Sequence, residues 1–491
     1  MTEEKKPSFL KSTLIYGIGG MLNKFLSFFL LPLFTAYLTP KDYGVTAILG
    51  TMTFVLTSIF TLGFGTSIGL SFFDTKNEFR KEESIHTALI ILLLSAGLMF
   101  LFGSIFSIKF AEHFLNDKEH YNFVILSLIS NFFNIIMTPL IVYYQFENKA
   151  KKYIILTNLT SVLAILTNVL FVVYFKRGVQ GLLEAGVISS LLTFLIFCID
   201  VFNNLKFKFS KNVSKVLLKQ GLPMVPSFAS LFVIQQSNRV FLEHFNGLES
   251  LGIYSIGYNL GMVMSIFVNA FQNTWLAFFL SYMDKKKEAE EVFGKITTYY
   301  ILSLGFINTM FFIFAGSIVA FMTKDAFHSS YKIVGLAATS HFLNGLFALL
   351  LPALYFEKEV KYVTLIQIFA AVFSTITNIF LIIYFSEFGA ALGLVIGTFY
   401  IVLFQYIWNL IGNPNYIKIK YEWGKIALFS MLYCIFSSVM LINRNLDKTT
   451  EIIYSFSLST ILLLLTLILL NNEDKNKLKA FVLQKLNRLK K

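Results

Sequence analysis

Long apolar stretches recur along the whole chain and limit what it can fold into. A transmembrane helix needs about 20 mostly apolar residues, and stretches of this kind alternate here with short polar connections. Apolar residues make up 56% of the chain and charged residues 14%, whereas soluble domains carry about 25% charged residues. We therefore predict an all-α polytopic membrane protein with about 14 transmembrane helices. The predicted spans are 12–38, 43–73, 86–108, 121–144, 153–174, 181–201, 217–243, 251–281, 296–322, 333–356, 362–384, 388–410, 426–443 and 451–470.

The rest of the composition excludes several other classes of protein. The two cysteines, Cys198 and Cys434, both lie in apolar runs, which excludes a disulfide framework and a cysteine-ligated metal site. The net charge is +13, but the basic residues occur in short runs between apolar segments, so we expect no nucleic-acid partner. The connecting segments contain no phosphate-binding glycine loop, paired metal-binding histidines or nucleophile motif. We therefore expect no enzymatic activity, no cofactor and no metal site.

Lysine and arginine are distributed unevenly between alternate connections. With a cytoplasmic N-terminus, the inner segments hold 30 of the 41 Lys and Arg residues and the outer segments hold 9. Cytoplasmic loops of membrane proteins carry the excess of these residues. We therefore predict that both termini are cytoplasmic.

Part of the sequence recurs after six predicted spans. Residues around the fifth span reappear around the eleventh at an offset of 210, and a weaker match links the first and seventh spans. An even number of spans preserves orientation, so the copies form two parallel lobes related by an axis along the membrane normal. Transporters built from such repeats carry their substrate at the interface between the repeats. The strong matches are Phe146, Glu147, Lys151, Thr167, Asn168, Tyr174 and Phe175 with Phe356, Glu357, Lys361, Thr377, Asn378, Tyr384 and Phe385; the weaker ones are Gly17 with Gly221, and Asp42, Tyr43 and Gly44 with Ser250, Leu251 and Gly252.

This repeat divides the chain into five predicted segments. Residues 1–201 form an N-lobe of six spans, and residues 217–410 form a C-lobe of six spans. A basic cytoplasmic linker, 202–216, joins the lobes, and residues 411–470 add two further spans. Residues 471–491 form a basic amphipathic tail, which we expect to lie on anionic membrane lipids at the cytoplasmic surface.

A cation lies near the middle of the first predicted span. Lys24 has Asn23 and Ser27 beside it, and a cation at the centre of a membrane helix costs about 2.5–3.5 kcal/mol on insertion scales. Such a residue normally faces a water-filled cavity or a counter-ion. Lys24 and Asn23 are therefore candidates for binding an anionic substrate. The alternative is that Lys24 extends to the headgroups or forms a structural ion pair.

A second cation ends a polar run in the seventh predicted span. Gln235 and Gln236 precede Arg239, whose guanidinium can hold two phosphate oxygens at once. All three are candidate substrate-binding residues. Because Arg239 lies near the outer end of the span, the alternative is that it extends to the outer headgroups.

Carboxylates and amides supply the other polar groups inside the spans. Glu184 and Asp200, both in the sixth span, are candidate sites for Na+ or H+ coupling, with a position at the membrane interface as the alternative. Eight amides are candidates for lining a sugar path, with hydrogen bonds between helices as the alternative. These amides are Asn131, Asn134, Asn168, Asn269, Gln272, Asn273, Asn308 and Asn378.

Two stretches resemble a known family. The first runs from Tyr16-Gly17-Ile18-Gly19 through Pro32-Leu33 to Tyr37-Leu38-Thr39-Pro40-Lys41-Asp42-Tyr43-Gly44. The second is Asn238-Arg239-Val240-Phe241-Leu242 followed by Leu251-Gly252-Ile253-Tyr254-Ser255. Both are similar to bacterial polysaccharide-biosynthesis membrane proteins, the lipid-linked oligosaccharide (O-antigen type) flippases of the multidrug/oligosaccharidyl-lipid/polysaccharide exporter superfamily.

The resemblance implies a two-lobed flippase of 14 helices in the bacterial inner membrane. It implies that undecaprenyl-pyrophosphate-linked oligosaccharide crosses the membrane by alternating access for surface polysaccharide assembly, with other assembly proteins as partners. Family members often carry an acidic residue before the arginine, where this chain has Asn238. The alternatives are an ion-coupled drug or metabolite antiporter of the same superfamily and a membrane enzyme or scaffold of polysaccharide assembly.

Overall fold

The chain folds into helices joined by short connections. The computed structural model describes residues 30–73, 81–146, 150–204, 208–359, 361–442 and 448–469, and no strand occurs within these ranges. The predicted all-α fold class is therefore confirmed. The long helices are α2 (Pro40–Phe60), α3 (Phe64–Phe73), α4 (Lys81–Phe114), α5 (Tyr121–Phe146), α6 (Ala150–Asn168), α7 (Gly178–Asn204), α8 (Lys211–Gly221), α9 (Val225–Gly261), α10 (Met264–Leu280), α11 (Lys286–Ile313), α12 (Ala315–Met322), α13 (Tyr331–Leu350), α15 (Lys361–Ile411), α16 (Trp423–Ile442) and α17 (Lys448–Leu469). The short elements are η1 (Lys118–His120), η2 (Val169–Tyr174), η3 (Leu222–Met224), η4 (Asp325–Ser330) and α14 (Pro352–Phe356).

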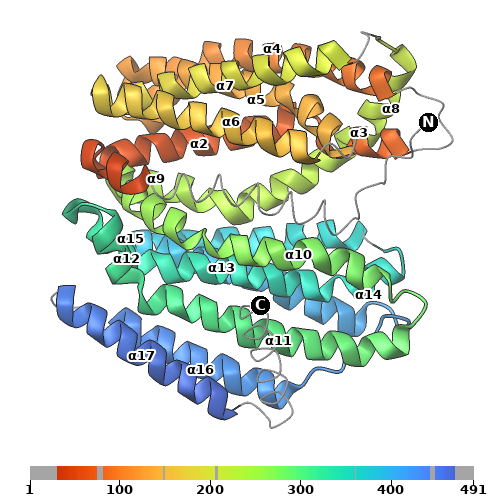
Figure 1. The fold of residues 1–491 in the computed structure, drawn as a ribbon, viewed down its shortest axis with the longest axis vertical. Helices are drawn as coiled ribbons and strands as arrows, with labels where there is room; N and C mark the ends of the chain where they lie inside the picture. The colour runs from red at the N-terminus through yellow and green to blue at the C-terminus, as the bar shows by residue number, and fades with distance from the viewer. Residues whose placement is uncertain are drawn as a thin grey trace, which may run out of the picture.

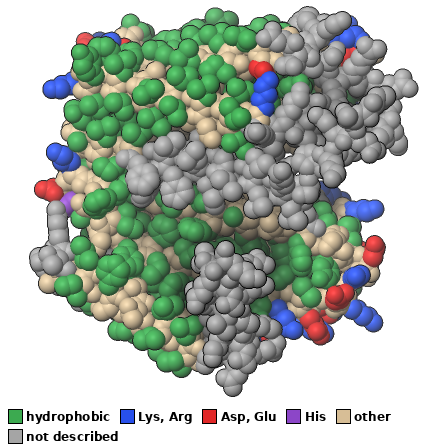
Figure 2. All heavy atoms as spheres, viewed as in Figure 1, with side chains coloured by type: hydrophobic (Ala, Val, Ile, Leu, Met, Phe, Trp, Pro, Cys, Tyr) green, Lys and Arg blue, Asp and Glu red, His purple; other side chains and the backbone are tan. Residues whose placement is uncertain are grey.

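These helices form two halves with α9 between them (Figure 1). Helices α2–α8 lie in one half and α10–α17 in the other, and α9 packs against both α2 and α15. Figure 2 shows apolar side chains over most of the visible face, with Lys, Arg, Asp and Glu mainly at its left and right edges. An apolar band between charged ends is the surface that a bilayer requires. The residue boundaries of the two predicted lobes remain a prediction.

The number of spans follows only partly from the helices. Ten described helices are long and apolar enough to cross a membrane, or up to eleven if the bent pair Phe232–Gly261 and Met264–Leu280 is one span. The protein is thus a multi-pass membrane protein. Residues 12–29 of the predicted span 12–38 lie outside the described residues, as does the whole tail 471–491. The count of 14 and the orientation of the termini therefore stay predictions.

Helix α15 is a hairpin of two spans. Its 51 residues would reach about 77 Å if straight, whereas the hydrocarbon core is about 30 Å thick. The chain turns back at Ser386, where φ is 51° and ψ is −131°. Gly389 and Gly393 then pack against Leu381 and Asn378 of the preceding arm. The two arms correspond to the predicted spans 362–384 and 388–410.

Helix α9 turns in the same way at Gly247. Its φ of 81° and ψ of 176° belong to a region that glycine alone adopts readily. Across the turn, the Asn238 amide donates a hydrogen bond of 2.5 Å to the Tyr254 hydroxyl. The turn lies between the predicted spans 217–243 and 251–281, which confirms the break between them.

Three predicted spans are interrupted. Span 43–73 is broken between α2 and α3, because Leu62 and Gly63 have φ angles of 52° and 69°. Span 296–322 is broken at Phe314 between α11 and α12, and span 333–356 is broken before Pro352. Proline lacks the N–H that an uninterrupted helix needs.

The internal repeat is visible in the backbone. Lys176 and Ser386, which are 210 residues apart, have φ angles of 53° and 51° and end corresponding helical segments. The amides of Asn168 and Asn378 each donate to a group four residues earlier in their own helix. The sequence matches therefore extend to local geometry.

The predicted linker 202–216 contains the start of α8, which packs against α3 and α4. The Ser210 N–H donates to the Thr87 hydroxyl at 3.1 Å, and Lys208 forms an ion pair with Glu83. At the other end of α8, a Cβ on Gly221 would overlap the carbonyl oxygen of Leu62. The linker from Lys208 onward and α8 are therefore attached to the N-terminal half.

Candidate functional site

The two halves meet backbone to backbone at the end of the molecule where α9 turns, which we call the Gly247 end. A Cβ on Gly44 would overlap the carbonyl oxygen of Leu248, and a Cβ on Gly252 would overlap that of Pro40. The contact is reciprocal, since each glycine packs against the residue four positions before the other. The weak repeat match pairs the same two glycines, as expected if the two predicted copies are related by an axis between them.

Further contacts close the Gly247 end. The rings of Tyr43 and Phe327 meet edge to face with centroids 5.3 Å apart. The Thr35 hydroxyl reaches the carbonyl oxygen of Met322 at 3.5 Å. Leu31, just before α2, is buried in a cluster with residues of α9, α12 and α13. The N-terminal half is thereby sealed against the C-terminal half at this end.

Arg239 is directed into the helix bundle. Its guanidinium carbon lies 4.9 Å from the centre of the Tyr258 ring on the other arm of α9, a cation–π arrangement. The neighbouring Asn238 is fully buried and donates to the Tyr254 hydroxyl and, at 3.4 Å, to the carbonyl oxygen of Ala390. Arg239 therefore contacts the other arm of α9, and its role in substrate binding stays a prediction.

The charge of Arg239 has no carboxylate partner in the described part of the chain. None of the ion pairs there includes Arg239 or Glu243, which lies one turn further along α9 and is buried. The Nε of Arg239 and the Oε1 of Gln236 are buried without a hydrogen-bond partner among the described residues. Gln235 and Gln236, both half-buried, share this arm of α9. The structure thus brings Gln235, Gln236 and Arg239 together on the helix between the two halves.

Glu184 and Asp200 lie towards opposite ends of α7 and are both in ion pairs. Glu184 accepts from Arg177 at 2.9 Å and from Gln180 at 3.0 Å. Asp200 accepts from Lys152 and from the Tyr144 hydroxyl. Neither carboxylate is near the polar face of α9. Lys24 and Asn23 lie outside the described residues.

Most of the candidate amides bond within the protein. Gln272 donates to the carbonyl oxygen of Asn344 at 3.1 Å, and Asn308 donates to the Thr339 hydroxyl at 3.0 Å. These contacts join helices, as the alternative interpretation holds. Asn134, Asn269 and Asn273 differ, because they are exposed and have no hydrogen-bond partner among the described residues.

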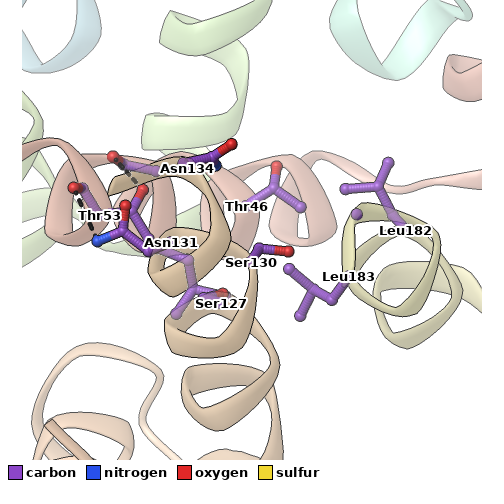
Figure 3. Close-up of a pocket in the computed structure, with 11 residues that line it drawn as sticks. Thr46, Thr53, Ser127, Ser130, Asn131, Asn134, Leu182 and Leu183 are labelled. Carbon is purple, nitrogen blue, oxygen red and sulfur yellow. Dashed lines mark hydrogen bonds between the residues drawn. The ribbon is translucent and has the colours of Figure 1, made fainter. Parts of the chain in front are cut away.

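Asn134 lines a cavity of about 210 Å³ between α2, α5 and α7 (Figure 3). The Asn131 amide accepts from the Thr57 hydroxyl at 2.6 Å beside it. In Figure 3, Ser130 lies between α5 and the leucines of α7. No charged side chain lines this cavity. Its lining residues are Thr46, Leu49, Gly50, Thr53, Ser127, Ser130, Asn131, Asn134, Leu182, Leu183 and Gly186.

The cavity residues other than the two asparagines were not selected from the sequence. Threonine and serine are common in membrane helices, where their hydroxyls bond back to their own helix. The spacing of Thr46, Gly50 and Thr53 along one face of α2 is the available signal. The described residues contain no group of three or more His, Cys, Asp or Glu that could hold a metal ion.

The fold is that of the transporters of the MOP superfamily. The chain is similar to the lipid II flippase MurJ in an inward closed conformation, with a TM-score of 0.65 and 14% identity over 91% of this chain and 98% of that one. It is also similar to an inward-facing multidrug resistance MATE family transporter of that superfamily, with a TM-score of 0.61 and 14% identity over 87% and 96%. These two relatives are a flippase and a transporter, and they define the class of the fold.

The chain belongs to the polysaccharide biosynthesis protein family, whose model matches residues 9–276. It is 24% identical to "Lsg locus putative protein 1" of Haemophilus influenzae over 56% of this chain and 67% of that protein. A second relative from the same organism, an uncharacterized membrane protein, is 23% identical over 60% of this chain and 70% of its own length. The chain thus combines membership of this family with the fold of the MOP superfamily transporters.

Proposed function

We propose that the protein is a flippase that moves undecaprenyl-pyrophosphate-linked oligosaccharide across the bacterial inner membrane by alternating access. The cargo would serve surface polysaccharide assembly, such as that of O-antigen, with other assembly membrane proteins as partners. The observation that carries the proposal is Arg239, a permanent cation inside the bundle with no carboxylate partner among the described residues. A guanidinium binds phosphate oxygens through two parallel hydrogen bonds. The family and the likeness to a lipid II flippase support the same cargo class.

In this proposal, residues at the interface of the two halves hold the headgroup. Lys24 and Asn23 of the first span and Gln235, Gln236 and Arg239 of α9 bind the pyrophosphate, while the polyprenyl tail stays in lipid. A water-poor site strengthens each of these charge interactions.

The predicted orientation of the termini assigns the closed end to one side of the membrane. With a cytoplasmic N-terminus, the Gly247 end faces outward, so the structure corresponds to a state closed on the outer side. Release of cargo then requires the contact between Gly44 and Gly252 to separate. Coupling to Na+ or H+ through Glu184 or Asp200 requires that the ion pair holding each carboxylate opens first.

The test is translocation in reconstituted vesicles. Undecaprenyl pyrophosphate carrying one N-acetylhexosamine is placed in the vesicles, and its arrival in the opposite leaflet is followed by chemical modification of the sugar. We expect the protein to accelerate arrival, and Arg239→Gln to slow it by roughly 10–100-fold, the loss of one charge-assisted hydrogen-bonded contact. Lys332→Gln is the control, because Lys332 is an exposed cation that lies over Tyr331 at 6.0 Å. Vesicles with wild-type protein that are no faster than protein-free vesicles would contradict the proposal.

A further inference from the structure

We propose that the cavity between α2, α5 and α7 binds one uncharged sugar ring of the lipid-linked cargo, an inference that rests on the proposed function. This places sugar recognition in the N-terminal half, apart from the cationic residue of α9. The argument uses the charge, hydrogen-bonding capacity, size and depth of the cavity.

The lining of the cavity carries no charge. Its polar side chains are hydroxyls and carboxamides, and none of its eleven lining residues is Lys, Arg, His, Asp or Glu. A phosphate would need a cation there and a cationic drug would need a carboxylate, because an isolated charge away from water is costly. The ligand that such a lining suits is uncharged and rich in hydroxyl groups.

Its polar groups offer both donors and acceptors. The hydroxyls of Thr46, Thr53 and Ser127 each donate at 2.9 Å to a backbone carbonyl of their own helix, which leaves their oxygens as acceptors. Ser130 and Asn134 make no hydrogen bond with any other described residue and remain available as donors. A sugar hydroxyl both donates and accepts, so it can use both kinds of group.

The size and shape suit one sugar ring. A cavity of about 210 Å³ has room for about seven waters at about 30 Å³ each. No atom lies within 4 Å of the position of a Cβ on Gly50, and a Cβ on Gly186 would lie 3.4 Å from the Ser130 hydroxyl oxygen. The two glycines therefore leave space for a ring, while Leu49, Leu182 and Leu183 supply apolar surface for its C–H faces.

The polar groups of α2 and α5 lie at matching distances along their helices. Thr46 and Thr53 lie about 9 and 20 Å along α2, at a rise of 1.5 Å per residue. Ser127 and Asn134 lie at the same distances along α5. Unsatisfied polar groups at such depth are costly and persist where they line a water-filled or ligand-binding space.

The first experiment fills the cavity. Gly50→Leu is compared with Gly97→Leu, since no atom lies within 4 Å of a Cβ at either position and Gly97 is on α4, outside the cavity. Both are reconstituted and tested with undecaprenyl pyrophosphates carrying one hexose or one N-acetylhexosamine, and with sugar-free undecaprenyl pyrophosphate. We expect Gly50→Leu to slow the sugar-bearing lipids about 10-fold and to leave the sugar-free lipid unchanged. Gly97→Leu should leave both unchanged.

The outcomes separate this inference from the function on which it rests. A wild-type protein that moves neither lipid overturns the proposed function. If the wild-type protein moves both the sugar-bearing and the sugar-free lipids, the proposed function stands. If Gly50→Leu then slows the two lipids equally, or slows neither, only the assignment of the cavity is overturned. Asn134→Leu, with Asn158→Leu on α6 as control, repeats the comparison by removing a donor instead of filling space. A free monosaccharide can also be added as an inhibitor of translocation. If it inhibits at the same concentration as the lipid-linked sugar does, the cavity binds a free sugar and the proposal is overturned.

Discussion

Carboxylates near the ends of the spans are held by specific donors in the protein. Asp200 accepts from Tyr144 and Lys152. Glu359, in the turn between α14 and α15, accepts from the hydroxyl of buried Tyr416. Hydrogen bonds to a charged acceptor are worth about 1.5–3 kcal/mol each. The first set joins helices α5, α6 and α7, and the second pair joins the connecting segments on either side of α15.

Tyr416 provides a test of this attachment at high pH. Burial and the adjacent Glu359 carboxylate raise the pKa of Tyr416 to about 12, above the ordinary value of about 10. The folded protein keeps this proton longer than the unfolded chain does, so the stabilisation is complete below pH 10 and is lost as the pH rises towards 12. We expect Tyr416→Phe to lower the unfolding temperature at pH 8, and the difference from wild type to shrink above pH 10. Tyr174→Phe, at a position that is 76% exposed, is the control, and a difference that stays constant with pH would refute the assignment.

Only some of the individual residues of the candidate site could be predicted from the sequence. Arg239 and the glutamines were found because charge and amide runs are rare inside apolar spans. Glu184 was predicted as a coupling site, and the structure shows it paired with Arg177, which lies seven residues earlier, just before α7 begins. Asn131 and Asn134 are indistinguishable in sequence, and only the packing shows that one bonds to Thr57 while the other faces the cavity.

Among the helices, turns marked by polar residues were predictable and turns inside apolar runs were not. The hairpins of α9 and α15 turn at Gly247 and Ser386, where the apolar pattern is interrupted. The break between α2 and α3 falls in a continuous apolar run, so hydropathy does not reveal it. Its cause lies in tertiary contact, because a Cβ on Gly63 would overlap the carbonyl oxygen of Gly221 at the end of α8.

The contact between α2 and α9 predicts that replacing glycine by alanine has a large effect at the contact and little effect elsewhere on α2. Gly44→Ala and Gly252→Ala should each force the halves apart at the Gly247 end, because the new Cβ would overlap a backbone carbonyl. Gly50→Ala should not, since its Cβ would meet no atom within 4 Å. The readout is the yield of disulfide between Tyr43→Cys and Phe327→Cys, in a background with Cys198→Ser and Cys434→Ser. An undiminished yield in Gly44→Ala protein that elutes as a folded species would argue against this contact.

For the whole molecule, the sequence repeat predicted two related halves, and hydropathy predicted that they are helical. Neither the repeat nor the hydropathy predicted how the linker is held. The basic residues of 202–216 indicated a connection, whereas the structure attaches α8 to α3 and α4 through Ser210, Lys208 and Gly221. We therefore expect movement between the halves to occur at the few residues after α8, where Leu222–Met224 form a short helical turn and Pro226 is the second residue of α9.

Two engineered disulfides test whether the halves separate while the linker stays attached to the N-terminal half. Oxidising the pair Tyr43→Cys and Phe327→Cys joins the two halves and should stop translocation, because the Gly247 end can no longer open. Oxidising the pair Thr87→Cys and Ser210→Cys joins the linker to the N-terminal half, where it is already attached, and should leave the rate unchanged. The initial rate in vesicles is measured before and after reduction. Continued transport by the first oxidised pair would mean that the halves do not separate at this end.

The reciprocal contact of Gly44 and Gly252 has the form of an interface between identical subunits, in which one surface patch meets itself across a two-fold axis. In a homodimer, one substitution would change both sides of such a patch at once. In this chain the two glycines are separate positions, so one side of the contact can be altered while the other is kept. Each position has the same steric requirement, because a Cβ at either glycine would overlap a backbone carbonyl of the other helix.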